Sequence, residues 1–490
     1  MIKKMDRNCL IEAADRYQQE NEFEKARELY QKINELFPGD FDLIARELHC
    51  SIGICHWQRY EYLQRTLRDN FRHKGGFLIG EAILASPFFD AQDLLEISRR
   101  RASHFTQLIS QSKPHVRKDR NALRKRKLRI GFLGADFYNQ ATTHLMVGLI
   151  EERNREEFEY IAYDYGPAPD DKMRHRITSA FDRLRRVPDS DNEKIAELIR
   201  TDEIDVLLYI RDPGDPRYGV LARRPAPVQL AYLYNPSGYG APLVDFLVAD
   251  EITVPPELEH NYSEKIVRLP FSYQPNDAKR ATPQRCSRKE FNLPSDKVVL
   301  ANLGSSFKIT PTMFDVWCEI LRRYPQCVLW LLEQRVGIAS NLRLEASLRG
   351  IDPSRIIFSP VQSTTRHISR LSCADFMLDT YPYGGHTGSS DALWAGLPVL
   401  TLMGETFASR VAASLLGAVG LSCLVARTQQ EYVDIASRLI DDTSALAAHR
   451  THLVTRRRSL PLFDIRAYTR HFEAMLARVS TAPGSGSGSG

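Results

Sequence analysis

The sequence predicts an α/β protein with two Rossmann-like domains that follow an all-helical region over residues 1–112. From residue 128 onward, short and almost continuously apolar runs alternate with helical stretches, which is typical of buried parallel strands. The pattern restarts after a polar stretch with prolines near residues 272–295, which indicates a second domain. We therefore expect one domain over residues 128–280 and a second, with C-terminal helices, over residues 281–483.

The apolar runs are the predicted strands. They cover residues 128–137, 159–166, 205–212, 228–235 and 246–252 in the first domain, and residues 298–305, 327–333, 355–360, 376–380 and 398–402 in the second. Ligands of such sheets bind beyond the carboxyl ends of the strands. We therefore expect the functional residues just after these runs, and the ligand in the cleft between the two domains.

Length and composition fit a globular protein. The 490 residues are 43% hydrophobic and 26% charged, which excludes a disordered or collagen-like rod. The chain has no run of 18 apolar residues and no apolar stretch behind its charged start, so we expect no membrane span and no secretory signal. The eight cysteines are scattered and include no CxxC pair, which favours a reducing compartment; we predict a cytoplasmic location.

The helical region carries one tetratricopeptide-like unit. Residues 10–38 place small and aromatic side chains at the offsets of two antiparallel helices, with Ala14 and Ala26 at the crossing and Pro38 after the second helix. No second copy follows at the period of about 34 residues that such repeats have. Two roles stay open for this region: a structural cap, or a surface that binds a partner protein.

Two further segments lie outside the predicted domains. Residues 113–127 are strongly basic, and such a run can bind nucleic acid. Its place between two differently patterned regions favours a solvated linker, so we expect no nucleic-acid partner. Residues 484–490, GSGSGSG, are predicted to be a flexible tail that takes no part in the fold.

The most informative segment covers residues 378–414. A strand is expected to end at Asp379, a Gly384–Gly385 turn follows, and the run from His386 to Asp391 opens a helix. Glycines let the backbone approach a ligand closely, and the free N–H groups of a first helical turn favour a diphosphate. Neither GxGxxG nor GxxxxGK[ST] occurs at the strand ends, which argues against a dehydrogenase and a P-loop ATPase.

This segment resembles the nucleotide-binding part of the O-GlcNAc transferase family, which also contains the plant Spindly proteins and the bacterial adhesin N-glucosyltransferases. The shared features are GHT, an Asp five residues after the His, LWAG, and GETxASRVAAS at residues 404–414. The resemblance extends over most of residues 128–475, through stretches such as DFYNQATTHLM (136–146) and RRPAPVQ (223–229). It implies the GT-B fold of two Rossmann-like domains, and catalysis without a metal or other cofactor.

The resemblance assigns roles on the nucleotide side. Lys308, in ANLGSSFKITP, matches the lysine that contacts the diphosphate. A fixed ammonium there would stabilise the charge that develops as the sugar leaves. His386 and Thr387, beside Gly385, match the diphosphate contacts, and Asp391 matches the ribose-binding Asp.

The base of the nucleotide has its own matching positions. His367 matches the residue that stacks on the uracil ring, and Gln362 matches one that reads the base through its backbone. Thr364 stands where the family often has a nucleotide-binding Lys, so the base contacts differ there.

The acceptor side is less closely matched. His144 matches a histidine of the family whose pKa suits a general base, although a structural histidine is the alternative. An earlier family histidine is replaced by Gln140. Asp136 is expected to orient His144, to bind the acceptor, or to cap the following helix. Tyr234 and Pro236 fall at the family's sugar contacts.

We therefore expect an inverting transferase that moves one sugar from a UDP-sugar donor to a protein or peptide acceptor, with GlcNAc on Ser or Thr preferred. Tyr383 stands beside the expected acetamide site, where its ring would favour glucose, so a UDP-glucose-dependent N-glucosyltransferase acting on Asn is an alternative. A GDP-fucose transferase and a non-catalytic binding module are further alternatives. His386 and Asp391 argue against both, together with Thr387 for the first and Lys308 for the second.

Overall fold

The computed structural model describes residues 7–74, 80–109 and 126–481. The predicted tail and nearly all of the predicted basic linker lie outside these residues. By compactness the chain divides into two units. Unit 1 comprises residues 1–90, 281–404 and 421–455, and unit 2 comprises residues 91–280, 405–420 and 456–490.

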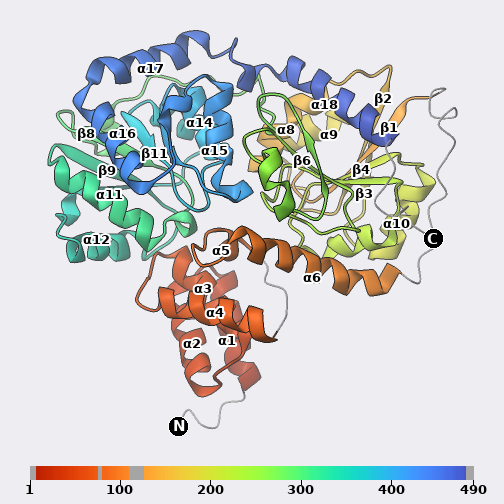
Figure 1. The fold of residues 1–490 in the computed structure, drawn as a ribbon, viewed down its shortest axis with the longest axis horizontal. Coiled ribbons are helices and arrows are strands. Elements are labelled where there is room, and N and C mark those ends of the chain that lie inside the picture. The colour runs from red at the N-terminus through yellow and green to blue at the C-terminus, as the bar shows by residue number, and fades with distance from the viewer. Residues whose placement is uncertain (1–6, 75–79, 110–125, 482–490) are drawn as a thin grey trace. The chain divides into compact units, whose positions relative to one another are not determined.

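The N-terminal region is helical, as predicted (Figure 1). Its helices are α1 (Arg7–Gln19), α2 (Phe23–Leu36), α3 (Phe41–Gly53), α4 (Tyr60–Lys74), α5 (Glu81–Leu84) and α6 (Ala91–Ile109). The side chains of Ala14 and Ala26 are completely buried where α1 packs on α2, together with the ring of Tyr30. Helices α1 to α5 belong to unit 1 and α6 belongs to unit 2.

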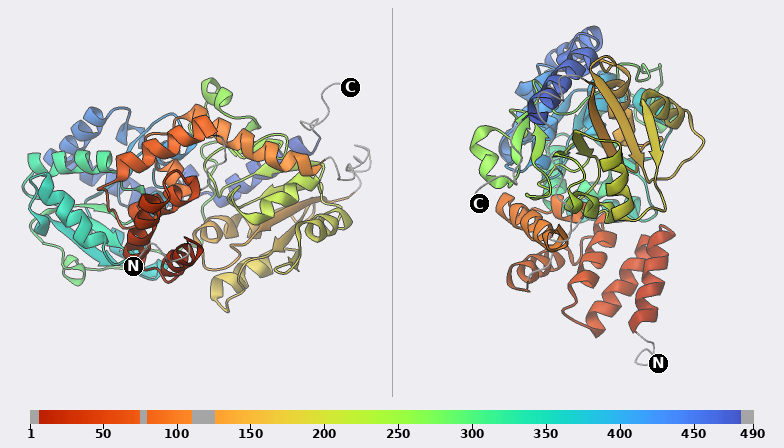
Figure 2. Two further views of the ribbon diagram at one scale, coloured as in Figure 1. Left: turned by 90° about the horizontal axis from the view of Figure 1, so that it is seen from below. Right: turned by 90° about the vertical axis from the view of Figure 1, so that its right-hand side faces the viewer.

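Unit 2 contains a seven-stranded parallel sheet, some of whose strands are seen side by side in the right-hand view of Figure 2. The strands are β1 (Leu128–Gly134), β2 (Phe158–Asp164), β3 (Arg183–Arg186), β4 (Val206–Tyr209), β5 (Val228–Ala231), β6 (Phe246–Ala249) and β7 (Lys265–Arg268), in the order β3-β2-β1-β4-β5-β6-β7. Helices α8 (Ala141–Glu151), α9 (Lys172–Ala180), α10 (Asn192–Thr201), α15 (Val411–Ala418) and α18 (Ile465–Ser480) belong to the same unit.

Unit 1 contains a six-stranded parallel sheet. Its strands are β8 (Val298–Asn302), β9 (Cys327–Glu333), β10 (Ile356–Pro360), β11 (Phe376–Leu378), β12 (Val399–Leu402) and β13 (Val425–Ala426), in the order β10-β9-β8-β11-β12-β13. Around it lie α11 (Pro311–Arg323), α12 (Ile338–Leu348), α13 (Thr364–Leu371), α14 (Thr387–Ala395) and α16 (Gln429–Asp441), followed by α17 (Thr443–Arg456) (Figure 1).

The predicted fold class is confirmed: a helical region precedes two parallel α/β sheets, and every predicted run overlaps a strand. No strand was predicted at β3, β7 or β13, which are edge strands. The strands β3 and β7 are short, and three of the four residues of β3 and two of the four of β7 are charged. In β3, the Arg183 and Arg185 guanidinium groups pair with the carboxylate of Asp202. Edge strands are half solvated, so they lack the apolar run that marks a central strand.

The position of α18 differs from our expectation, which placed the C-terminal helices with the second domain. Helix α18 belongs to unit 2 because its apolar face packs there: the Phe472 ring lies 5.0 Å from the Tyr232 ring. The Glu473 carboxylate also accepts a hydrogen bond of 2.8 Å from the Asn154 N–H. The chain passes from unit 2 to unit 1 between residues 280 and 281, and the predicted domain bounds stay a prediction.

The strand order places two ligand-binding positions. In such sheets the ligand binds at the carboxyl ends of the strands where the order reverses. In unit 2 this switch point lies between β1 and β4, and in unit 1 between β8 and β11. Among the described residues no helix is long and apolar enough to cross a membrane.

We expect Gly166→Ala to destabilise the protein. A Cβ on Gly166 would lie 1.8 Å from the backbone oxygen of Ala135. This clash cannot be relieved by a rotamer change, because the atom it meets belongs to the backbone. Overpacking of this kind lowers the free energy of unfolding by about 1–3 kcal/mol, so the melting temperature should fall by several degrees. The control is Gly388→Ala in helix α14, whose Cβ would meet nothing within 4 Å. Equal melting temperatures for wild type and Gly166→Ala would contradict the steric argument.

Candidate active site

The predicted site residues fall into two groups that follow the switch-point strands. The nucleotide-side residues, all in unit 1, are Lys308, Gln362, His367, Tyr383, Gly385, His386, Thr387 and Asp391. The acceptor-side residues, all in unit 2, are Asp136, His144, Tyr234 and Pro236. In the first group Lys308 contacts Tyr383, which lies beside His386. In the second, Arg211 contacts both Asp136 and Tyr234.

A buried carboxylate shapes the glycine turn after β11. Asp379 is completely buried, and its Oδ1 accepts hydrogen bonds from the N–H groups of Thr380 at 2.9 Å and Gly385 at 2.7 Å. Its Oδ2 accepts a bond of 2.8 Å from the Thr401 hydroxyl. Burial raises the pKa of Asp379, and these hydrogen bonds and Lys308 oppose the rise. The sequence analysis gave Asp379 no role, although an acid directly after an apolar strand was a signal.

Gly385 has no room for a side chain. A Cβ at this position would lie 2.1 Å from the Ser389 Oγ and 3.0 Å from the Asp379 Oδ1. The glycine therefore lets the backbone approach Ser389 in the first turn of α14 closely. His386 is the N-cap residue of α14, Thr387 begins the helix and Asp391 follows one turn later. This is the helix N-terminus that the motif predicts.

The Lys308 side chain lies at the same turn. The residue ends the short helix η5 (Ser306–Lys308), which follows β8. Its Nζ donates a hydrogen bond of 2.9 Å to the Gly384 carbonyl oxygen and lies 3.7 Å from the centre of the Tyr383 ring. The ammonium is thus held in place before any ligand binds, which is the condition for electrostatic stabilisation of a leaving group.

The N-terminal helices contact the segment that carries Lys308. The Ser306 hydroxyl donates a hydrogen bond of 2.9 Å to the Gly53 carbonyl at the end of α3, and the Cys55 thiol contacts the Ser306 carbonyl oxygen at 3.6 Å. The Asn341 amide donates to the Ile54 carbonyl at 2.9 Å. Carbonyl groups at a helix C-terminus need such partners. The helical region therefore supports the Lys308 segment, which favours the structural role left open by the sequence.

The Tyr383 ring is engaged with protein groups. Only 8% of the residue is exposed, and its ring lies 5.9 Å from the Phe307 ring and 5.2 Å from the His386 ring. Because the Lys308 ammonium sits over its face, the ring stabilises that charge by a cation–π contact. The sequence analysis expected Tyr383 to line the sugar pocket; that role stays a prediction.

The residues predicted to contact the base of the nucleotide lie after β10. Gln362 follows this strand by two residues, and His367 lies half-buried on α13. The Arg370 Nη2 lies 2.9 Å from the His367 Nδ1, and since an arginine can only donate, Nδ1 accepts and Nε2 carries the proton. Burial and the Arg370 charge lower the pKa of His367 to about 4. The ring is therefore neutral near pH 7. The sequence analysis missed Arg370, which lies one helical turn from His367.

On the acceptor side, Arg211 joins the ends of three strands. Asp136 follows β1, and both of its carboxylate oxygens lie 2.8 Å from the Arg211 Nη1 after β4. The Arg211 guanidinium lies 4.7 Å from the centre of the Tyr234 ring, which follows β5. Burial raises the pKa of Asp136, and Arg211 opposes the rise. Sequence reasoning missed Arg211, although it directly follows the apolar run of β4.

Asp136 differs from two of its expected roles. Its carboxylate pairs with Arg211 rather than with His144, and the N-cap residue of α8 is Gln140. Only its backbone takes part in that helix start, where the Asp136 carbonyl accepts a hydrogen bond from the Thr143 hydroxyl. Contact with the acceptor stays a prediction for Asp136. Pro236 is buried two residues beyond Tyr234.

His144 is half-buried in the first turn of α8. Its Nε2 lies 2.7 Å from the Asn139 Oδ1, so that Nε2 carries the proton and Nδ1 has the free electron pair. Burial, and then the charge of Arg280, lower the pKa of His144. A neutral ring at pH 7 can accept a proton. Asn139, which orients the ring, was not found from the sequence.

We expect His367 to make stability depend on pH. A histidine whose pKa is lowered in the folded state contributes stability that is present above its ordinary pKa and is lost as the pH falls. This window runs from about 6.5 down through about 4. In His367→Gln, the melting temperature should fall less steeply across this window than in wild type.

The control for this experiment is His260→Gln, which changes an exposed histidine. It should follow the wild-type curve. Melting curves of wild type and His367→Gln that stay parallel from pH 7 to about 4 would show that His367 does not control this dependence.

Comparison with known proteins identifies the family. The sequence pattern of glycosyl transferase family 41 matches residues 95–284 and 277–472. The probable UDP-N-acetylglucosamine–peptide N-acetylglucosaminyltransferase SEC of Arabidopsis thaliana is 32% identical over 448 residues, which cover 87% of this chain and 45% of that protein. The probable enzyme of the same description named SPINDLY, from Petunia hybrida, is 28% identical over 362 residues, covering 71% of this chain and 38% of that protein. The chain thus spans less than half the length of these relatives.

A solved structure supports the same assignment. A mutant of the O-GlcNAc transferase of Thermobaculum terrenum superposes with a TM-score of 0.83 at 26% identity, covering 97% of this chain and 91% of that chain. The GT-B fold that the resemblance implied is confirmed, and so is the resemblance itself. The chain belongs to glycosyl transferase family 41.

Proposed function

We propose that the chain is an inverting protein glycosyltransferase that transfers one GlcNAc from UDP-GlcNAc to serine or threonine side chains. The observation that carries the proposal is the Lys308 ammonium, which is fixed at the glycine turn before the N-terminus of α14. A lysine and a helix N-terminus at one switch point form a site for a diphosphate leaving group. The relatives are named as UDP-N-acetylglucosamine–peptide N-acetylglucosaminyltransferases, which supports a UDP-GlcNAc donor and a peptide acceptor.

On the nucleotide side, each group has a proposed task. The first-turn N–H groups of α14 and the Thr387 hydroxyl bind the diphosphate, and Asp391 accepts the ribose hydroxyls. The neutral His367 ring stacks on the uracil, beside Gln362. As the bond from the sugar to the diphosphate breaks, negative charge develops on the phosphate, and Lys308 stabilises that charge more than the ground state.

On the acceptor side, the hydroxyl attacks the sugar carbon from the face opposite the leaving diphosphate, so that the configuration inverts. We assign His144 as the base that takes the hydroxyl proton, because its ring is neutral and the contact between Nε2 and Asn139 leaves Nδ1 unprotonated. Asp136 and Tyr234, held together by Arg211, are proposed to line the acceptor and sugar subsites.

The donor and the class of protein are tested together. Purified chain is incubated with UDP-GlcNAc, UDP-glucose or GDP-fucose while nucleotide release is measured, and co-expressed candidate acceptors are weighed by intact-mass spectrometry. Release of UDP from UDP-GlcNAc and the added mass of one N-acetylhexosamine are expected. A hexose on Asn would support the glucosyltransferase alternative, and fucose on the acceptor would support the Spindly-like one. No release with any donor and acceptor would indicate a binding module.

We expect Lys308→Ala to lower turnover by about a hundredfold or more while the protein stays folded. Loss of one preorganised charge contact to a leaving group commonly has this effect. Turnover is measured with UDP-GlcNAc at saturation, with melting temperature as the test of folding. The matched control is Lys289→Ala, an exposed lysine of unit 1. A folded Lys308→Ala with nearly normal turnover would remove Lys308 from the mechanism.

We also propose catalysis without a metal or other cofactor, with the UDP-sugar as co-substrate. The charges assigned to the diphosphate are a lysine and a helix N-terminus, and the described residues include no group of three His, Cys, Asp or Glu side chains placed to hold a metal ion. Activity is expected to persist in excess EDTA. Loss of activity in EDTA that manganese restores would contradict this proposal.

The compartment is part of the same proposal. We place the protein in the cytoplasm, because its cysteines are scattered through the folded units and none forms a disulfide among the described residues. We propose no membrane partner and no nucleic-acid partner.

A further inference from the structure

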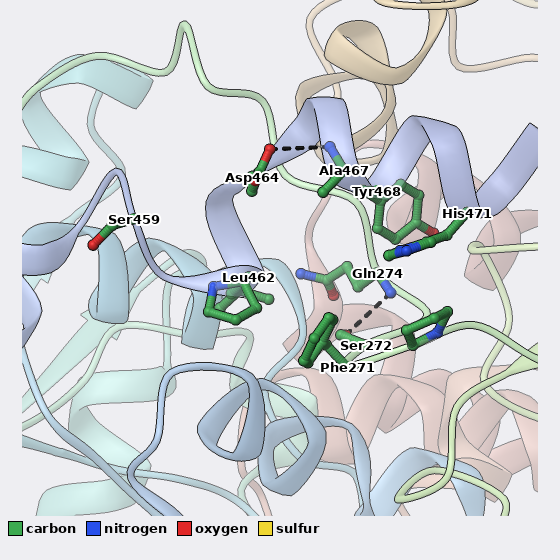
Figure 3. A pocket seen from close by; sticks show the side chains of 11 residues that line it. Phe271, Ser272, Gln274, Ser459, Leu462, Asp464, Ala467, Tyr468 and His471 are labelled. Atoms are coloured by element: carbon green, nitrogen blue, oxygen red, sulfur yellow. Dashed lines mark hydrogen bonds between the residues drawn. The ribbon is translucent and has the colours of Figure 1, made fainter.

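Unit 2 contains a pocket that the proposed catalytic groups do not use. Its volume is about 210 Å³. One wall is the loop of residues 270–274 after β7, and the other comprises residues 459–471, which include the start of α18 (Figure 3). The loop follows the carboxyl end of its strand, so the pocket lies at the same edge of the sheet as Asp136 and Tyr234.

Among the polar residues that line this pocket, Gln274 has a buried carboxamide without partners in the described part of the chain. The residue is 1% exposed, and neither its Oε1 nor its Nε2 has a hydrogen-bond partner among the described residues. Figure 3 shows the side chain lying across the pocket, between the Phe271 ring and α18, with its carboxamide toward Leu462. A buried amide without partners is unfavourable, so native proteins nearly always pair such groups. The carboxamide can donate and accept at the same time.

The rest of the lining is mixed: Phe271 and Leu462 are apolar, whereas Ser459, Asp464 and His471 are polar. Phe271 is 58% exposed at the rim, with a positive φ of 66° that a phenylalanine rarely adopts. The Tyr468 hydroxyl donates to the Tyr273 carbonyl and lies 2.7 Å from the Tyr232 hydroxyl, which fixes the ring of Tyr468. The nearby Asp464 carboxylate already accepts from the Ala467 N–H at 3.0 Å. A ligand that fits would join an apolar group to an amide.

The volume limits the ligand further. Whole small-molecule ligands occupy pockets of about 300–1,000 Å³, whereas about 150 Å³ is enough for a benzene ring. The space therefore suits one side chain with its neighbouring amide. The backbone of a polypeptide offers an N–H and a C=O beside each side chain, which match the acceptor and donor of Gln274.

We propose that this pocket binds one apolar side chain and the adjoining backbone amide of the acceptor polypeptide, outside the residue that receives the sugar. That the polypeptide is the acceptor rests on the proposed function. A physical connection supports the assignment, because Tyr468 of the pocket is hydrogen-bonded to Tyr232, two residues before Tyr234. The pocket would then add affinity for the acceptor without taking part in the chemical step.

The binding step is tested on the full chain with a defined probe, N-acetyl-leucine methylamide, by saturation-transfer NMR. A ligand of this size is expected to bind with a Kd on the order of 1 mM. N-acetyl-glycine methylamide, which lacks the side chain, should bind at least about tenfold more weakly. Gln274→Met keeps the volume and removes the carboxamide, and should weaken leucine-probe binding by about tenfold.

Two further variants distinguish binding in the pocket from binding elsewhere on the surface. Phe271→Ala removes the apolar rim and should also weaken binding, whereas the control Leu348→Ala changes an exposed leucine of unit 1 and should not. Gln274→Met should leave the melting temperature unchanged or higher, since it removes an unpaired buried amide. Absence of binding, or binding that Gln274→Met and Phe271→Ala leave unchanged, would overturn the proposal. A lower melting temperature in Gln274→Met without probe binding would also overturn the proposal. That result would show that the Gln274 amide stabilises the folded protein instead of binding a ligand.

The kinetic test distinguishes this inference from the proposed function. With an acceptor protein, Gln274→Met should raise the acceptor KM by about tenfold and leave kcat and the acceptor-independent hydrolysis of UDP-GlcNAc unchanged. Sugar transfer with an unaltered acceptor KM would overturn the pocket's role and leave the transferase standing. Probe binding in a chain that transfers no sugar would refute the transferase and the acceptor assignment, while the peptide pocket itself would stand.

Discussion

The buried carboxylate of Asp379 is the constraint on which the proposed nucleotide side depends. It ties the end of β11, the glycine turn and β12 together through bonds to Thr380, Gly385 and Thr401. The turn then presents the Gly384 carbonyl to Lys308 and leads directly into α14. Because the carboxylate is completely buried, losing these partners would leave a desolvated charge, which proteins avoid. The arrangement is therefore strongly held before any ligand binds.

The helical N-terminal region also contacts the segment that carries Lys308. The carbonyl groups at the end of α3 are satisfied by Ser306 and Asn341, and Ser306 is only two residues from Lys308. A helix end that bonds to the lysine segment restricts the positions that this segment can adopt. Support for the lysine, rather than a separate binding module, is thus the role that the contacts of these helices favour.

On the proposed acceptor side, the Arg211 guanidinium holds the residues together, whereas a glycine turn does so on the nucleotide side. Arg211 spans the ends of β1, β4 and β5 by pairing with Asp136 and stacking on Tyr234. Removing one partner of such a partly buried pair is costly because the other charge stays behind in a poorly solvated place. The cluster keeps the strand ends rigid. The pocket at Gln274 lies further along the same edge, where the loop after β7 meets the start of α18.

The sequence by itself determined the fold class, most strands and the helix N-terminus after the glycine turn. Buried parallel strands require apolar runs, and the residues from Gly384 to Asp391 act through local geometry, so both signals lie in contiguous stretches. Edge strands such as β3 escaped because charged residues can form them. Only the tertiary structure decided which distant groups meet. Lys308 and Gly384 are 76 residues apart, and Asp136 and Arg211 are 75 apart. No local pattern encodes such pairs, since they arise when sheet order brings the ends of different strands together.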